Sequence, residues 1–189
     1  LQDMKVLARR NAVTMGRLIT LEDFETALYK NPYIYSAVVK DWKYSDYVDE
    51  PYIVKIWAVN NLGESLGELT REKLKKDLMS KAIADVTVQV LEVENVNFDI
   101  EVDVVLSLDN ATARERLRVE IKNYLSTKYR TEVMGFGETI SYSLLTSRIQ
   151  AYSPYVKDVR VKTPSKDIKV GNIQFPKLGN VVVNLVNEL

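Results

Sequence analysis

Three carboxylates at alternating positions are the residues of this sequence most readily placed in a chemical role. Asp99, Glu101 and Asp103 fall on every second residue, so a strand would put them on one face. Carboxylate oxygens are the ligands that Ca²⁺ and Mg²⁺ prefer, which makes a metal-assisted enzyme that uses carboxylates alone one interpretation. Metal sites of this kind usually gather oxygen ligands from several segments, so we favour a simple exposed acidic strand face and expect no bound metal. Charged residues on such a face also discourage unwanted pairing with strands of other molecules.

The side chains that are missing exclude most other catalytic designs. The 189 residues include no cysteine and no histidine, which excludes Ser-His-Asp and Cys-His nucleophile sites, Cys-ligated zinc and HExxH zinc sites. The segment Gly135-Phe136-Gly137-Glu138 is superficially like a phosphate-binding loop. It lacks the third glycine of GxGxxG and the GK[ST] of a P-loop, so we interpret it as a turn between helices. We expect no enzyme, no catalytic residue and no cofactor.

Aromatic residues are the most informative surface feature of the sequence. The chain has 11 tyrosines, and one short hairpin region combines four aromatic residues with acidic neighbours: Trp42, Tyr44, Tyr47 and Tyr52, flanked by Asp41, Asp46, Asp49 and Glu50. Aromatic side chains with a polar group are enriched at protein interfaces. Stacking on RNA bases is an alternative use, although acidic neighbours repel phosphate. We therefore predict a protein interface here, with packing within the hairpin as an equally compatible interpretation.

The overall charge and hydropathy point to neither nucleic acid nor membrane as a partner. Acidic and basic residues balance at 26 each, so no basic footprint for nucleic acid is visible in the total. No apolar run approaches the roughly 20 residues that span a bilayer, and no secretory leader opens the sequence. Because the chain begins at Leu1, we expect it to be part of something longer.

The elements that must position these residues follow from the hydrophobic pattern. The clearest signal is a long half-buried strand in which six apolar residues alternate with mostly polar ones: Phe98, Ile100, Val102, Val104, Leu106 and Leu108. Its apolar face needs a covering layer of helix or sheet. Thr20 with Asp23 predicts a capped helix, Asn110 predicts the start of another, and Thr139 predicts a third with Leu144 facing inward.

The complete order of predicted elements indicates an α+β protein. It reads helix, strand, strand, helix, strand, and then strand, helix, helix, strand, strand. We predict two small subdomains with mixed or antiparallel sheets, covered by helices on one face. The boundaries that we expect are a lead-in segment at 1–20, a first subdomain at 21–92 and a second at 93–189.

Two segments of this chain resemble a known family. Residues 17–25, Arg-Leu-Ile-Thr-Leu-Glu-Asp-Phe-Glu, resemble the R-x-v-T-x-e-D-[FY]-e segment of J-like baseplate wedge proteins of contractile-tailed bacteriophages. Residues 137–149 resemble that family's g-x-x-I-x-x-S-x-L-x-x-x-I segment, and the resemblance covers roughly residues 17–163. Tyr33 and Tyr155 stand where the family has the glycine of Pro-Gly-Val, so those turns must differ, as in a divergent branch such as that of the T-even phages.

The resemblance implies a scaffold without catalytic residues. It implies a structural component of the baseplate wedge or inner ring, which multimerises and contacts neighbouring tail proteins. The implied partners are other baseplate or tail proteins and further copies of the chain, as a dimer or ring. The implied location is the virion tail baseplate, assembled in the host bacterial cytoplasm. An RNA-binding α+β module and the carboxylate-only enzyme remain as alternatives.

Overall fold

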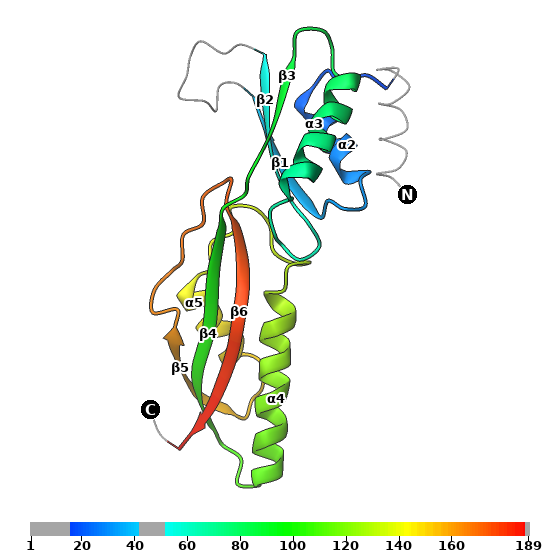
Figure 1. Cartoon of the computed structure of the whole chain (residues 1–189). Coiled ribbons are helices and arrows are strands. Elements are labelled where there is room, and N and C mark those ends of the chain that lie inside the picture. The colour runs from blue at the N-terminus through cyan, green and yellow to red at the C-terminus, as the bar shows by residue number, and fades with distance from the viewer. Residues whose placement is uncertain (1–15, 42–51, 188–189) are drawn as a thin grey trace. The chain divides into compact units, whose positions relative to one another are not determined.

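The chain divides into two compact units, with the boundary between Glu94 and Asn95. The computed structural model describes residues 16–41 and 52–187 (Figure 1). Within these residues each unit holds two helices and one three-stranded sheet, and the predicted α+β class is confirmed. Unit 1 denotes the part up to Glu94, and unit 2 denotes the part from Asn95 onward.

Unit 1 is built around a mixed sheet. Its elements are α2 (Leu21–Tyr29), β1 (Ser36–Lys40), β2 (Ile53–Val59), α3 (Glu68–Lys81) and β3 (Thr87–Leu91). The strand order is β1-β2-β3, in which β2 is antiparallel to β1 and parallel to β3. The central place of β2 agrees with its apolar residues on both faces. Helix α3 provides the crossover that a parallel pair of strands requires.

A capping box fixes the start of α2, as the sequence predicts. The Thr20 hydroxyl accepts a hydrogen bond from the Asp23 backbone N–H at 3.2 Å, and Asp23 Oδ2 accepts from the Thr20 N–H at 2.8 Å. Asp23 Oδ2 also accepts from the Ile19 N–H at 3.1 Å. These bonds satisfy N–H groups that have no partner within a helix. The helix ends at Tyr29, just before Asn31-Pro32, because a residue that precedes proline disfavours helical backbone.

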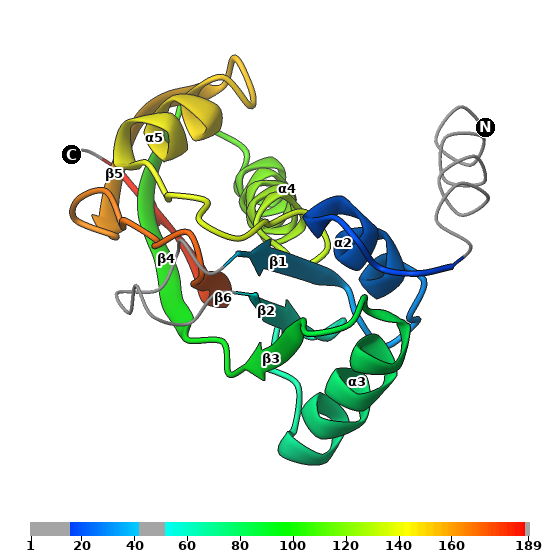
Figure 2. The same ribbon diagram turned by 90° about the horizontal axis from the view of Figure 1, so that it is seen from above.

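Both helices of unit 1 contribute to one hydrophobic core. Phe24 and Leu28 of α2 and Leu74 and Leu78 of α3 belong to the same buried cluster, together with residues of all three strands: Ala37, Val39, Val54, Ile56, Ala58 and Val88. Figure 2 shows α2 and α3 on the same side of the sheet. Fully burying one such aliphatic or aromatic side chain contributes about 1.5–3 kcal/mol, so this shared core holds helices and sheet together.

Unit 2 has a second mixed sheet with a longer central strand. Its elements are β4 (Asn95–Leu106), α4 (Ala111–Lys128), α5 (Tyr142–Gln150), β5 (Val156–Thr163) and β6 (Phe175–Val186). The strand order is β5-β4-β6, with β4 antiparallel to β5 and parallel to β6. The predicted alternation along β4 is confirmed at five positions, which are all buried: Phe98, Ile100, Val102, Val104 and Leu106. Leu108 lies beyond the end of the strand.

Helices α4 and α5 lie together over the sheet of unit 2. The ring of Tyr124 on α4 is 4.9 Å from the ring of Tyr152, which follows α5, between centroids. Helix α4 buries Leu117, Ile121 and Leu125. Helix α5 buries Leu145 and Ile149. The two helices therefore form one layer that covers the apolar face of β4.

The cap of α5 differs from the sequence prediction. Ser141, and not Thr139, caps the helix, with its hydroxyl accepting from the Leu144 N–H at 3.4 Å. Ile140 is extended because its backbone pairs with Ile168 through hydrogen bonds of 3.0 and 2.9 Å. This start turns Leu144 outward, so its predicted inward orientation is wrong. No helix in residues 16–41 or 52–187 is long and apolar enough to cross a membrane.

Candidate interaction surfaces

A charged cluster occupies the face of the unit 2 sheet that carries the polar residues of β4. Lys162 of β5 places its Nζ 2.9 Å from Asp103 Oδ1 and 3.5 Å from Glu101 Oε1. Asn184 of β6 donates from Nδ2 to the same two carboxylates, at 3.1 Å to Asp103 and 3.2 Å to Glu101. The cluster therefore ties all three strands of the sheet together across its centre.

The environment of Asp103 sets its protonation. Burial alone would raise the pKa of its carboxyl, but hydrogen bonds from Lys162 and Asn184, with the charges of Lys162 and Arg160, lower that pKa below its ordinary value. The hydrogen bond to Asp103 is also the main reason that the pKa of Lys162 is raised. Asp103 is only 7% exposed and is ionised because its neighbours compensate for the lost water.

The prediction of an exposed acidic strand face is wrong for Asp103. Strand β4 is the centre of the sheet and not an edge, so its carboxylates do not guard against stray pairing. Asp99 is exposed, and its Oδ1 accepts from the Asn180 backbone N–H at 2.6 Å. The described residues contain no group of three or more acidic side chains arranged to hold a metal ion. The described residues of this strand therefore include no cluster of metal ligands for a metal-assisted enzyme that uses carboxylates alone.

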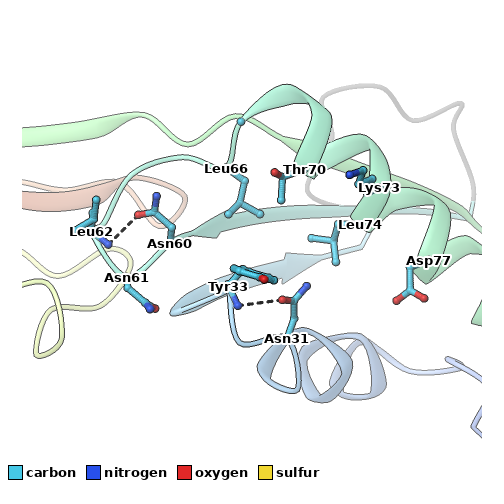
Figure 3. Close-up of a pocket in the computed structure, with 11 residues that line it drawn as sticks. Asn31, Tyr33, Asn60, Asn61, Leu62, Leu66, Thr70, Lys73, Leu74 and Asp77 are labelled. Atoms are coloured by element: carbon cyan, nitrogen blue, oxygen red, sulfur yellow. Dashed lines mark hydrogen bonds between the residues drawn. The ribbon is translucent and has the colours of Figure 1, made fainter.

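A groove lies in unit 1 between α3 and the two loops at one end of the sheet. It has a volume of about 690 Å³. Leu66 and Leu74 are buried and form its floor. In Figure 3, Leu66 and Leu74 lie on one side of the groove, and Tyr33 lies on the other. Tyr33 is 73% exposed and Leu62 is 64% exposed, which leaves two large apolar side chains available at the rim.

Local hydrogen bonds hold the two rim residues in place. The Asn60 side-chain oxygen accepts from the Leu62 N–H at 2.8 Å and from the Glu64 N–H at 3.0 Å. Gly63 adopts the left-handed conformation (φ 69°) that closes this turn, which is unfavourable for other residues. On the other side, Asn31 Oδ1 accepts from the Tyr33 N–H at 3.0 Å. Tyr33 and Leu62 are thus presented on pre-formed turns.

The charge of the groove comes from α3. The helix carries five basic and three acidic residues. Asp77, which lines the groove, is paired with Lys81 at 2.7 Å. Lys73 also lines the groove, and it has no carboxylate partner among the residues that the structure describes. The groove therefore offers an exposed cation beside a leucine floor and a tyrosine.

The predicted interface residues fall mostly outside the described part of the chain. Trp42, Tyr44 and Tyr47 lie outside the described residues. Tyr52 is 64% exposed and has a left-handed backbone (φ 72°), which is rare for a bulky residue. Its carbonyl accepts from the Thr87 N–H at 2.9 Å, which holds it against β3. The prediction of a protein interface at these four positions stays a prediction.

The groove was not predicted from the sequence, since its residues are dispersed over 31–77. The Asn60-Asn61-Leu62-Gly63 turn was recognisable, but nothing in the pattern shows that Tyr33 lies opposite α3. The predicted turn at Gly135-Phe136-Gly137 is confirmed as a connection between α4 and α5. The Gly137 N–H donates to the Gln174 carbonyl at 3.1 Å, so this segment is anchored to the protein's own backbone.

Comparisons with known proteins agree with the resemblance seen in the sequence. Residues 96–184, nearly all of unit 2, match the model of a family described as Baseplate J-like protein C-terminal domain. A chain in the cryo-electron microscopy structure of the anti-feeding prophage baseplate, symmetrised sixfold, has a similar fold with a TM-score of 0.64 at 14% identity. The alignment covers 93% of this chain and 41% of that chain. No curated protein matches the sequence.

Residues 96–184 are therefore similar to the baseplate J-like C-terminal domain, and the predicted resemblance to baseplate J-like proteins is confirmed. The structural similarity extends over most of both units and shows a shared fold. The chain spans about two fifths of the length of the baseplate chain that it resembles.

Proposed function

We propose that this chain is a structural component of a contractile-tail baseplate, in its wedge or inner ring, where it multimerises and contacts neighbouring tail proteins. The observation that carries the proposal is the match of residues 96–184 to the baseplate J-like C-terminal domain. The fold shared with a chain of the anti-feeding prophage baseplate supports it. The protein's place is then the tail baseplate of a virion, assembled in the host bacterial cytoplasm.

The chemistry of the chain supports an assembly role. It has no histidine and no cysteine, the residues that most often act as bases, nucleophiles and metal ligands. It does present large exposed apolar side chains on its surface, among them Tyr33, Tyr52 and Leu62. Tyrosine is one of the residue types enriched among those that dominate the binding energy of protein interfaces.

Sedimentation velocity of the purified chain, combined with binding to other baseplate proteins of its own assembly, tests this function. We expect concentration-dependent association into dimers or larger species, or a stable complex with a neighbouring baseplate protein. A chain that stays monomeric at high concentration and binds none of these proteins would contradict the proposal. Binding of a single-stranded RNA that weakens with salt would support the RNA-binding alternative instead.

A further inference from the structure

A tight turn follows α3, beyond the end of the helix that is opposite to the floor of the groove. The Val86 N–H donates to the Ile83 carbonyl at 3.4 Å, and Asp85 has the left-handed backbone (φ 71°) that the third residue of a type II turn requires. Figure 1 shows this connection between α3 and β3 at one end of unit 1, and the connection between β2 and α3 at the other. Because Ile83 and Asp85 are both exposed, the turn presents an apolar side chain and a carboxylate together.

The side chains of this turn complement those of the groove. Asp85 has no hydrogen-bonding or ionic partner among the described residues, and the aliphatic Ile83 is 36% exposed. The groove offers the opposite properties, since Lys73 is an exposed cation without a carboxylate partner in the described part of the chain. Its floor consists of the buried Leu66 and Leu74. Opposite charge would favour the encounter and fix its direction.

The turn does not reach the groove of its own molecule. Leu66 precedes α3 and Ile83 follows it, and this helix of 14 residues is about 21 Å long at a rise of about 1.5 Å per residue. The base of the turn is also fixed. The Ile83 N–H donates to the Leu18 carbonyl at 3.3 Å, and the Leu18 N–H donates to the Lys81 carbonyl at 2.8 Å. A turn with this composition therefore has to come from another molecule to enter the groove.

The charge of the groove favours a protein segment over nucleic acid. Among the described residues that line it, only Lys73 and Asp77 are charged, and Asp77 is paired with Lys81 at 2.7 Å. Nucleic acid is bound through several cations that contact successive phosphates. One lysine beside two leucines instead suits a single carboxylate that stands next to an aliphatic side chain.

We propose that the groove receives the turn at 83–86 of a second copy of this chain, with Asp85 beside Lys73 and Ile83 on the leucine floor. The inference rests on the proposed function, because it assigns a surface to the multimerisation. Turn and groove are different surfaces of unit 1, so the contact is head-to-tail and continues from copy to copy. Such a contact builds a ring where the rotation between successive copies closes.

Self-association of the purified chain tests this contact. The insertion of one turn buries a small area, so the association is weak and is measured by sedimentation equilibrium at high protein concentration. We expect it to weaken as salt rises. Lys73→Glu should weaken it about fivefold or more, because two carboxylates then face each other. Asp85→Asn should weaken it about threefold, and asparagine tolerates the left-handed backbone at this position.

A mixture of these two variants is a sharper test of a head-to-tail contact. The Lys73→Glu chain keeps an intact turn, and the Asp85→Asn chain keeps an intact groove. One wild-type contact can therefore form between them, and we expect the mixture to form pairs with an affinity close to that of the wild-type chain. A mixture that associates no more strongly than either variant alone would overturn the proposal.

Control substitutions in unit 2 show whether the effect belongs to this contact. Lys157→Glu and Asp109→Asn make the same changes of charge at exposed positions, and both should leave self-association unchanged. Equal weakening by Lys73→Glu and Lys157→Glu would assign the effect to net charge and overturn the proposal. Circular dichroism checks the fold of each variant. Lys73 and Asp85 are exposed, so their substitution does not disturb the core.

The same measurements separate this inference from the proposed function. If the chain self-associates and neither Lys73→Glu nor Asp85→Asn weakens the association, the groove assignment is overturned and the assembly role stands. If the chain stays monomeric but binds another baseplate protein, the second copy is overturned as the occupant and the assembly role again stands. If it does neither, both proposals fail. Binding of single-stranded RNA that Lys73→Glu abolishes would assign the groove to phosphate and overturn this occupant.

Discussion

Asp99 accepts a hydrogen bond from the backbone N–H of Asn180 at 2.6 Å, although 81 residues separate the two. The bond lies where β6 has one residue more than β4, since Phe98 pairs with Leu178 and Ile100 pairs with Val181. The side chain thus satisfies an N–H group at an irregular position of the ladder, where the extra residue is left unpaired. Gly179 sits directly against this carboxylate.

Replacing Gly179 by alanine should destabilise unit 2. A Cβ at this position would collide with Asp99 Oδ1, which would have to leave its hydrogen bond to Asn180. Because Asp99 is exposed and can turn into solvent, the main loss is this hydrogen bond, and we expect a decrease of about 0.5–1.5 kcal/mol in the free energy of unfolding, measured by urea denaturation followed by circular dichroism. Gly135→Ala is the control, because no atom lies within 4 Å of its Cβ position. In a chain that already carries Asp99→Ala, the added Cβ has no carboxylate to displace, so Gly179→Ala should cost less. An equal loss of stability in the two backgrounds would contradict this explanation.

The charged cluster around Asp103 should make stability depend on acid pH. The pKa of the Asp103 carboxyl group is lower in the folded chain than in the unfolded chain. The contribution of Asp103 to the free energy of unfolding is therefore present above the unfolded pKa of about 3.9 and is lost as pH falls through the lower folded pKa. Lys162 has a raised pKa, so its contribution is present below its unfolded pKa and is lost only in strongly alkaline solution as pH rises through its folded pKa.

The substitution Asp103→Asn tests this dependence. We expect it to lower the free energy of unfolding by about 1–2 kcal/mol at pH 7 and by less at pH 2.5, because the contribution of the wild-type carboxylate is progressively lost as pH falls below the unfolded pKa toward the lower folded pKa. Urea denaturation at both pH values measures the difference. Asp109→Asn, at an exposed position, should change stability little at either pH. A penalty of the same size at pH 7 and pH 2.5 would show that charge is not its cause.

Truncation of Ile121 should affect the core of unit 2 strongly. This side chain of α4 is fully buried, whereas Val119 on the same helix is 41% exposed. Ile121→Ala should cost about 2–5 kcal/mol through lost burial and the cavity left behind. Val119→Ala should stay within about 0.5 kcal/mol, since it is a surface change. Hydrogen exchange of the β4 backbone amides measures the loss of stability, and it should be much faster in Ile121→Ala than in Val119→Ala. Similar exchange rates in the two variants would contradict the prediction.

Loss of the capping carboxylate of α2 should destabilise unit 1. Asp23→Ala removes the acceptor of the Ile19 and Thr20 N–H groups, and we expect a cost of about 1 kcal/mol. The two tryptophans, Trp42 and Trp57, belong to unit 1, so tryptophan fluorescence during urea denaturation follows this unit. Glu25→Ala, at a later position of α2, is the control. A larger effect at Glu25 would contradict the role of the cap.

Much of the fold could be predicted because local rules and packing agree. The Thr20–Asp23 box, the Asn110 cap and the alternation along β4 each depend on neighbours in the sequence, and each is confirmed. Which strands lie next to β4 could not be predicted, because the alternation of apolar and polar residues along a strand does not specify its neighbours in the sheet. The structure places β5 on one side of β4 and β6 on the other. For that reason the burial of Asp103, whose partners Lys162 and Asn184 come from those strands, was missed.

The candidate groove depends on tertiary structure still more. Tyr33, Leu62 and Lys73 lie on three separate segments, and each alone is an ordinary exposed residue. The helix start at Ser141 was missed for a related reason, since the pairing of Ile140 with Ile168 overrides the local cap signal at Thr139.

The order of strands in unit 2 has a consequence for how this protein is made. Strand β4 is the first element of the unit along the sequence and is therefore synthesised first, whereas one of its two neighbours, β6, is the last of the described elements of the unit to be synthesised. Until then one edge of a valine-rich strand stays open to pairing with other nascent chains. Slowing translation between β5 and β6 should therefore lower the yield of native protein by promoting aggregation.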